Sequence, residues 1–97
     1  MSALNDLLKT KREEILSIAA KHGAYNVRVF GSVARGDDGP DSDIDLLINL
    51  EPNRSLLDHA ALMLELQELL NCKVDIASER GLKPRVRDRI LREAVYL

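Results

Sequence analysis

Residues 31–46 read GSVARGDDGPDSDIDL. Gly31 and Ser32 directly follow Asn26–Phe30, a short β-branched and aromatic run that predicts a strand. After a short helical segment, the stretch becomes rich in glycine, aspartate and proline, and so many turn formers together predict a loop. The loop ends at Ile44–Ile48, a largely apolar run that predicts a second strand. The stretch therefore predicts a strand, a tight turn with one short helix, a loop and a second strand.

Further elements flank this stretch on both sides. Helical spacing of apolar residues and suitable capping residues mark the helices, and a short β-branched run marks another strand. The predicted helices cover residues 2–22, from Ser55 to about Asn71 and from Pro84 to about Val95, and the third strand covers Lys73–Ala77. Ser55 and Asp58 have the spacing of a capping pair at the start of the long helix. The element order is therefore α-β-α-β-α-β-α.

The connections predict how the strands pair. The long helix between the second and third strands is a crossover, which makes these two strands parallel neighbours. The shorter link between the first and second strands suits an antiparallel pair. We therefore predict an α/β (α+β) fold with a small mixed three-stranded sheet, in a single domain that covers residues 1–97.

Three aspartates are placed where the strands bring them together. Side chains alternate across a strand, so Asp43 and Asp45 point to the same face, about 7 Å apart. Asp75 lies between Val74 and Ile76 in an otherwise apolar strand, where a lone carboxylate is unfavourable unless it is paired or bound to metal. Carboxylate oxygens suit Mg²⁺, and three of them on adjacent strands could hold two metal ions for in-line attack on a phosphate.

The turn at Gly31 and Ser32 has a complementary chemistry. A glycine directly after a strand lets the backbone approach a ligand closely. A serine hydroxyl and N–H at a helix N-terminus suit a phosphate group. The turn and the carboxylates would therefore hold the same triphosphate from two sides.

These residues together resemble a known signature. Gly31-Ser32, ten intervening residues and then Asp43-Ile44-Asp45 resemble the motif of the DNA polymerase beta-like nucleotidyltransferase superfamily. The longer pattern GSVARG…SDIDLL resembles its minimal, MntA-type branch, and the likeness extends over nearly the whole chain. The resemblance implies that Gly31 and Ser32 contact the β- and γ-phosphates and that Asp43 and Asp45 bind both metal ions. It also implies that Asp75 binds the catalytic metal beside the attacking hydroxyl.

The resemblance further implies a function. Minimal proteins of this kind use ATP and Mg²⁺ to transfer AMP to a tyrosine of a HEPN-type ribonuclease toxin, and they thereby act as its antitoxin. The alternative is a non-catalytic antitoxin that blocks its partner by steric contact, with the nucleotide serving structure or regulation. A third hypothesis is transfer to a small molecule or an RNA end. The intact set of Ser32, Asp43, Asp45 and Asp75 favours the enzyme.

Other polar residues have simpler interpretations. Arg35 is expected to form an ion pair with a nearby acid rather than to contact phosphate, and Ser42 to cap the loop rather than to orient Asp43. His22 and His59 have no partners at metal-ligand spacing and are expected at the surface. Cys72 is expected to fill space in the interior.

The last predicted helix is basic although the chain as a whole is not. Arg85, Arg89 and Arg92 fall on one helical face. This face is either simply solvated or a docking surface for an acidic partner, or for RNA bound by that partner. A partner protein is expected because 97 residues leave no room for a domain that holds the acceptor.

Composition excludes several other classes of protein. A formal net charge of −2 gives no electrostatic basis for stable nucleic-acid binding. No apolar run reaches the roughly 18 residues of a membrane span, and the first residues lack a signal-peptide pattern. The single cysteine cannot form an intrachain disulfide, which suits a reducing cytoplasm.

Overall fold

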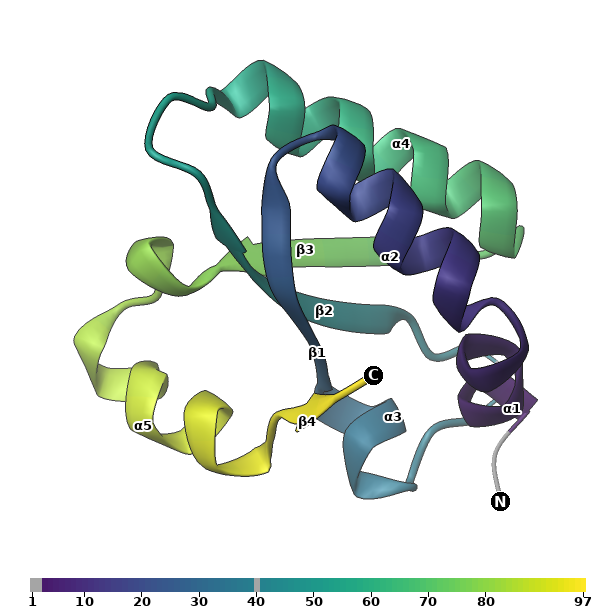
Figure 1. Ribbon diagram of the computed structural model, residues 1–97. Coiled ribbons are helices and arrows are strands. Elements are labelled where there is room, and N and C mark those ends of the chain that lie inside the picture. Colours follow the sequence, from purple (N-terminus) through teal and green to yellow (C-terminus); the bar gives the residue numbers. More distant parts are fainter. Residues whose placement is uncertain (1–2, 40) are drawn as a thin grey trace.

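The computed structural model describes residues 3–39 and 41–97. Its helices in this part of the chain are α1 (Ala3–Thr10), α2 (Arg12–Lys21), α3 (Gly31–Arg35), α4 (Leu56–Leu70) and α5 (Pro84–Glu93), with a 3₁₀ turn, η1 (Glu79–Gly81). Its strands are β1 (Ala24–Phe30), β2 (Ile44–Leu50), β3 (Val74–Ser78) and β4 (Val95–Tyr96). In Figure 1, α2 and α4 lie side by side over one face of the sheet and α5 lies on the opposite side, whereas α3 follows the end of β1, where its Val33 joins the buried core.

The pairing of the three longer strands is as predicted. β1 runs antiparallel to β2, and β2 runs parallel to β3, with α4 as the crossover between them. Ser55 caps α4: its hydroxyl accepts a hydrogen bond from the Leu57 N–H, and the Asp58 carboxylate accepts one from the Ser55 N–H. This capping box confirms the predicted start of the crossover helix.

The prediction of a three-stranded sheet is wrong, because the sheet in the described part of the chain has four strands. The order is β3-β2-β1-β4, so β4 covers the edge of β1. The last helix ends at Glu93 instead of continuing to about Val95, since Ala94 has an extended backbone. Val95 and Tyr96 then pair with Val29 and Arg28 of β1. Their β-branched and aromatic side chains suit a strand better than a final helical turn.

The predicted N-terminal helix is divided into two. Residue 2, where the prediction starts, lies outside the described residues, and the remaining segment is interrupted at Lys11 between α1 and α2. The Thr10 hydroxyl donates to the Asp6 carbonyl oxygen one turn back, a contact that bends helices. Gly23 follows the second helix with φ of 77°, as expected of a C-terminal glycine.

The two faces of β2 serve different purposes. Leu46 and Ile48 are buried against α2 and α4 in a core cluster that includes Ile15 and Leu62. Because side chains alternate, Asp45, Leu47 and Asn49 share the opposite face. That face carries the polar groups described below. Within the described residues, no helix combines the length and apolar character that a membrane crossing requires.

Candidate active site

Strand register brings two of the predicted aspartates side by side. Asp45 on β2 is the direct partner of Asp75 on β3 in the parallel pairing, so both side chains are on the same face of strands whose backbones lie about 4.8 Å apart. Asp43 precedes β2 by one residue and shares that face with Asp45. Its carboxylate lies 3.6 Å from Lys73 Nζ. The fold thus gathers Asp43, Asp45 and Asp75 at one end of the β2–β3 pair.

The surroundings of Asp45 perturb its carboxyl group. Burial raises the pKa of its carboxyl above the ordinary value, and the negative charges of Asp75 and Asp43 raise it further. Arg35 opposes this shift, and Glu93 adds to it. The ionised form of Asp45 is therefore unfavourable without a compensating cation.

The chemistry of these donors fits Mg²⁺. Among the described residues, no group of three or more histidine, cysteine or acidic side chains is arranged so that it could hold a metal ion. Mg²⁺ does not need three protein ligands, because it is commonly bound by one or two carboxylates together with water and substrate phosphate oxygens. Asp43 and Asp45 are half-buried and Asp75 is exposed on the edge strand β3, so metal ligands at this site would be shared with water and phosphate oxygens.

The turn at Gly31 is packed directly against Asp45. Gly31 has φ of 75°, a conformation that L side chains rarely adopt, and a Cβ atom at this position would overlap Asp45 Oδ2. Ser32 follows within α3 and is half-buried. The predicted phosphate turn and the predicted metal ligands therefore adjoin one another, as the sequence motif requires.

The turn has one partner that the sequence interpretation missed. Glu93, at the end of α5, accepts a hydrogen bond from the Gly31 N–H at 2.8 Å. The Gly31 N–H is thus already bonded within the protein. A weak signal was present in the sequence, because an acidic residue in the last turn of a helix opposes the helix dipole and needs a reason to be there.

The simpler interpretations of Arg35 and Ser42 are confirmed. Arg35 forms ion pairs with Asp37 at 3.2 Å and with Glu93 at 3.3 Å. The hydrogen bond and charge of Asp37, with a smaller contribution from Glu93, raise the pKa of the guanidinium. The Ser42 hydroxyl accepts a hydrogen bond from the Gly39 N–H at 2.8 Å and so closes the loop.

The two histidines are half-buried, rather than fully at the surface as was predicted for them. His22 is only 14% exposed in its side chain, and its Nε2 lies 3.1 Å from Glu65 Oε1. His59 Nε2 lies 2.9 Å from the carbonyl oxygen of Ile76 on β3. Both side chains bridge elements that are distant in sequence, which helical spacing alone does not reveal. Cys72 is half-buried against the core, and burial followed by the charge of Asp43 raises the pKa of its thiol.

A second polar cluster lies at the other end of β2. Arg28 on β1 is only 6% exposed. Its guanidinium donates to the Asn26 carbonyl oxygen and to Asn49 Oδ1, both at 2.8 Å, and lies 3.6 Å from Glu79. The Asn49 side chain in turn donates to Glu79 at 2.7 Å, and the Tyr96 ring stacks 5.6 Å from the guanidinium. The buried cation is thus fully compensated within the protein.

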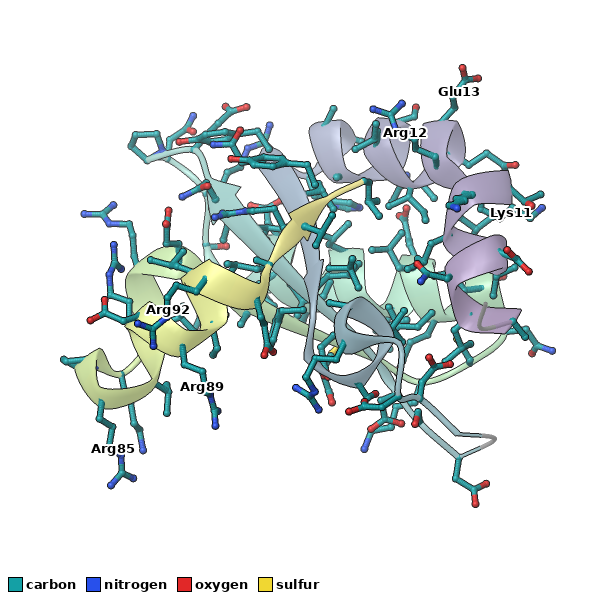
Figure 2. The ribbon with its side chains drawn as sticks, turned by 90° about the horizontal axis from the view of Figure 1, so that it is seen from below. Lys11, Arg12, Glu13, Arg85, Arg89 and Arg92 are labelled. Atoms are coloured by element: carbon teal, nitrogen blue, oxygen red, sulfur yellow. The ribbon has the colours of Figure 1, made fainter. Side chains whose placement is uncertain are left out.

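The arginines of α5 lie on one exposed face. Figure 2 shows Arg85 and Arg89 extending away from the body of the molecule, with Arg92 on the same helix. None of these three side chains forms an ion pair or hydrogen bond within residues 3–39 and 41–97. Arg87, by contrast, donates to the Glu79 carbonyl oxygen at 3.1 Å. The basic face therefore comprises Arg85, Arg89 and Arg92, as the helical spacing predicts.

Proteins of known sequence are similar to this chain over most of its length. The family model described as the nucleotidyltransferase domain matches residues 9–97. A candidate protein adenylyltransferase of Methanocaldococcus jannaschii is 40% identical over 84 residues, which cover 87% of this chain and 90% of the relative. The protein adenylyltransferase MntA of Thermococcus cleftensis is 38% identical over 93 residues, which cover 88% of this chain and 94% of the relative.

Solved structures give the same answer for the fold. A candidate minimal nucleotidyltransferase is 57% identical, with a TM-score of 0.88 over 96% of this chain and 95% of that chain. A toxin–antitoxin crystal structure with AMP-PNP is 17% identical, with a TM-score of 0.75 over 87% of this chain and 69% of that chain, a likeness of fold alone. The chain therefore belongs to the nucleotidyltransferase family, as an enzyme of its minimal, MntA-type branch with the polymerase beta-like fold.

Proposed function

We propose that this enzyme transfers AMP from ATP to a tyrosine hydroxyl of a HEPN-type ribonuclease toxin and thereby acts as its antitoxin. The observation that carries the proposal is the pairing of Asp45 with Asp75, with the Gly31 turn packed on Asp45. Two curated relatives named as protein adenylyltransferases support the choice of AMP and of a protein acceptor. The fold likeness to a toxin–antitoxin complex with AMP-PNP supports the choice of a toxin.

In the proposed reaction the phenolic oxygen of the tyrosine attacks the α-phosphorus of ATP. The bond between the α-phosphorus and the α–β bridging oxygen breaks, pyrophosphate leaves with the electron pair, and the phenol proton passes to solvent. Asp43, Asp45 and Asp75 are proposed to hold two Mg²⁺ ions, and Gly31 and Ser32 to line the site of the β- and γ-phosphates. Mg²⁺, when bound, would neutralise the triphosphate and lower the pKa of the phenol.

The acceptor must be positioned by a separate protein surface. An exposed nucleotide site without a positioned acceptor would mainly hydrolyse ATP, because alignment of the attacking hydroxyl supplies much of the rate. The basic face of Arg85, Arg89 and Arg92 is proposed to dock an acidic surface of the toxin. The charges at the α1–α2 junction, Lys11, Arg12 and Glu13, are of both signs and lie on the far side of the molecule from these arginines (Figure 2).

The test uses the product of the neighbouring open reading frame as the candidate toxin. The two proteins are incubated with ATP and Mg²⁺, and the intact mass of the partner is measured. One or more added AMP groups on a tyrosine are expected. An unmodified partner that is nevertheless inhibited would favour the steric antitoxin, and AMP found on a small molecule or RNA end would favour the third hypothesis.

The docking surface has its own test and a matched control. Replacing Arg85, Arg89 and Arg92 by glutamate should slow modification of the partner roughly tenfold or more, because the charge of the docking face is reversed. ATP binding should be unchanged in this variant. Reversing Lys9 and Arg12 on the α1–α2 side serves as the control and should have little effect. Equal modification by both variants would show that the toxin docks elsewhere.

A further inference from the structure

Glu93 joins the phosphate turn to the last helix through a single carboxylate. Its Oε1 accepts a hydrogen bond from the Gly31 N–H at 2.8 Å and lies 3.3 Å from Arg35 Nη1. Its Oε2 lies 3.4 Å from the same guanidinium nitrogen. The Glu93 side chain is only 21% exposed and its bond with Gly31 is partly buried, whereas the Arg35 side chain is 50% exposed. One carboxylate therefore fixes both a backbone amide and a cation of the same turn.

The position of this turn determines the surroundings of Asp45. Phe30, the residue before the turn, is the direct partner of Asp45 in the β1–β2 pairing. Gly31 itself lies so close to Asp45 Oδ2 that no Cβ atom fits between them. A small displacement of the turn would thus change the space beside Asp45. Glu93 restrains that displacement from the side of α5.

The helix dipole and a neighbouring carboxylate both oppose an acidic residue at this position, and only the contacts with Gly31 and Arg35 offset them. Glu93 occupies the last position of α5, where the helix dipole disfavours negative charge. It is also close enough to raise the pKa of Asp45, a like-charge interaction that Arg35 opposes. Conflicts between local preference and the observed arrangement tend to mark functional positions.

We propose that Glu93 is a positioning residue of the nucleotidyl-transfer site, which holds the Gly31 turn and Arg35 in place before the nucleotide binds. This proposal rests on the proposed function, because it assumes that the triphosphate enters beside Asp45. Glu93 does not contact the substrate. It pre-organises the Gly31 turn and Arg35 instead. Removal of the Glu93 carboxylate is therefore expected to weaken nucleotide binding and to slow nucleotidyl transfer.

Two substitutions separate the contacts of Glu93. Glu93→Ala removes the hydrogen-bond acceptor and the charge, whereas Glu93→Gln keeps an oxygen for the Gly31 N–H and loses the charge beside Arg35. Asp88→Asn, an exposed position on the same helix, is the control. The readouts are the amide resonance and hydrogen exchange of Gly31 without nucleotide, and the Kd of AMP-PNP with Mg²⁺ by calorimetry.

Glu93→Ala should shift the Gly31 resonance, speed its exchange about tenfold or more, and raise the Kd about tenfold. Glu93→Gln should be intermediate, and Asp88→Asn should resemble the wild type. If the alanine variant does not fold, the glutamine variant tests the positioning role, because it retains the hydrogen bond to the turn and is therefore expected to fold.

A purely structural role predicts a different result. Both Glu93 variants would then melt at lower temperature, while the folded proteins would keep the wild-type Kd for AMP-PNP even though the Gly31 resonance shifts, and the positioning role would be refuted. A wild-type protein that fails to bind AMP-PNP would instead contradict the proposed function, and the positioning role with it. The wild-type measurement thus distinguishes the two failures.

Discussion

Polar groups lie on the same face of the sheet at both ends of β2, but the two ends differ in how well neighbouring groups compensate a buried charge. At one end, Asp45 faces Asp75, and burial and like charges make its ionised form unfavourable. At the other end, Arg28 of the neighbouring strand β1 is more deeply buried, yet Glu79 pairs with its charge and Asn49 accepts one of its hydrogen bonds. The fold thus compensates a buried charge beside this end of β2. The unfavourable charge of Asp45 therefore supports the proposed ligand site at this end of the strand.

The largest expected effect comes from removing a carboxylate at the end of β2 that carries Asp43 and Asp45. Asp43→Asn and Asp45→Asn should each reduce AMP transfer on the order of a thousandfold, because metal-held charge neutralisation is lost. Without metal, Asp45→Asn should melt at a higher temperature than the wild type, since the like-charge repulsion disappears. Transfer is measured by partner mass and melting by circular dichroism in EDTA. Wild-type turnover in Asp45→Asn would place the chemistry elsewhere.

Disrupting the Arg28–Glu79 cluster should lower the stability of the fold and leave nucleotide binding unchanged. Glu79→Ala leaves the buried guanidinium of Arg28 without its carboxylate and should destabilise the fold by about 2 kcal/mol. For a domain of this size that corresponds to a fall in melting temperature of roughly 10 °C. Arg80→Ala, at an exposed neighbouring position, is the control. Below the melting transition, the Kd for ATP with Mg²⁺ should stay at the wild-type value.

The two ends should also respond to pH with opposite sign. The raised pKa of Asp45 means that the metal-free fold binds its proton more tightly than the unfolded chain does, so this contribution to stability falls as pH rises from about 4 towards the raised value. The pKa of Glu79 is lowered by its hydrogen bond from Asn49 and the charge of Arg28. Its contribution is present above the ordinary carboxyl pKa and is lost as pH falls through the lowered value.

Urea unfolding between pH 3.5 and 7 in EDTA measures this difference. Relative to the wild type, Asp45→Asn should remove the loss of stability on raising the pH, and Glu79→Gln should remove part of the loss on lowering it. Adding Mg²⁺ and ATP should suppress only the Asp45 effect. Identical pH profiles for the two variants would contradict the contrast between the ends.

The smallest expected effect concerns the hydroxyl of the turn. Ser32→Ala should reduce transfer by about tenfold or less, because the backbone N–H of residue 32 survives the change. ATP titrations at fixed Mg²⁺ should show a modest rise in KM. A loss as large as that of Asp45→Asn would mean that the hydroxyl has a more direct part in the reaction.

The sequence predicted those features that depend on local pattern. The spacing from Gly31-Ser32 to Asp43 and Asp45 was sufficient to predict the turn and the shared face, and the Ser55 cap fixed the start of the crossover helix. The partners of His22, His59 and Glu93 were missed because each comes from an element remote in the chain. The short strand β4 was missed for a similar reason: Val95 and Tyr96 become a strand only because β1 offers them an open edge.

The bond between Gly31 and Glu93 also has a consequence for the order of folding. It joins residues 62 positions apart, and the closing strand β4 pairs with β1 across a similar separation. Contacts of such long range carry the largest loop-closure entropy and tend to form late. A folding chain can therefore bury Leu46, Ile48 and their helical neighbours while the phosphate turn is still loose. During refolding, nucleotide binding should recover after the core has formed.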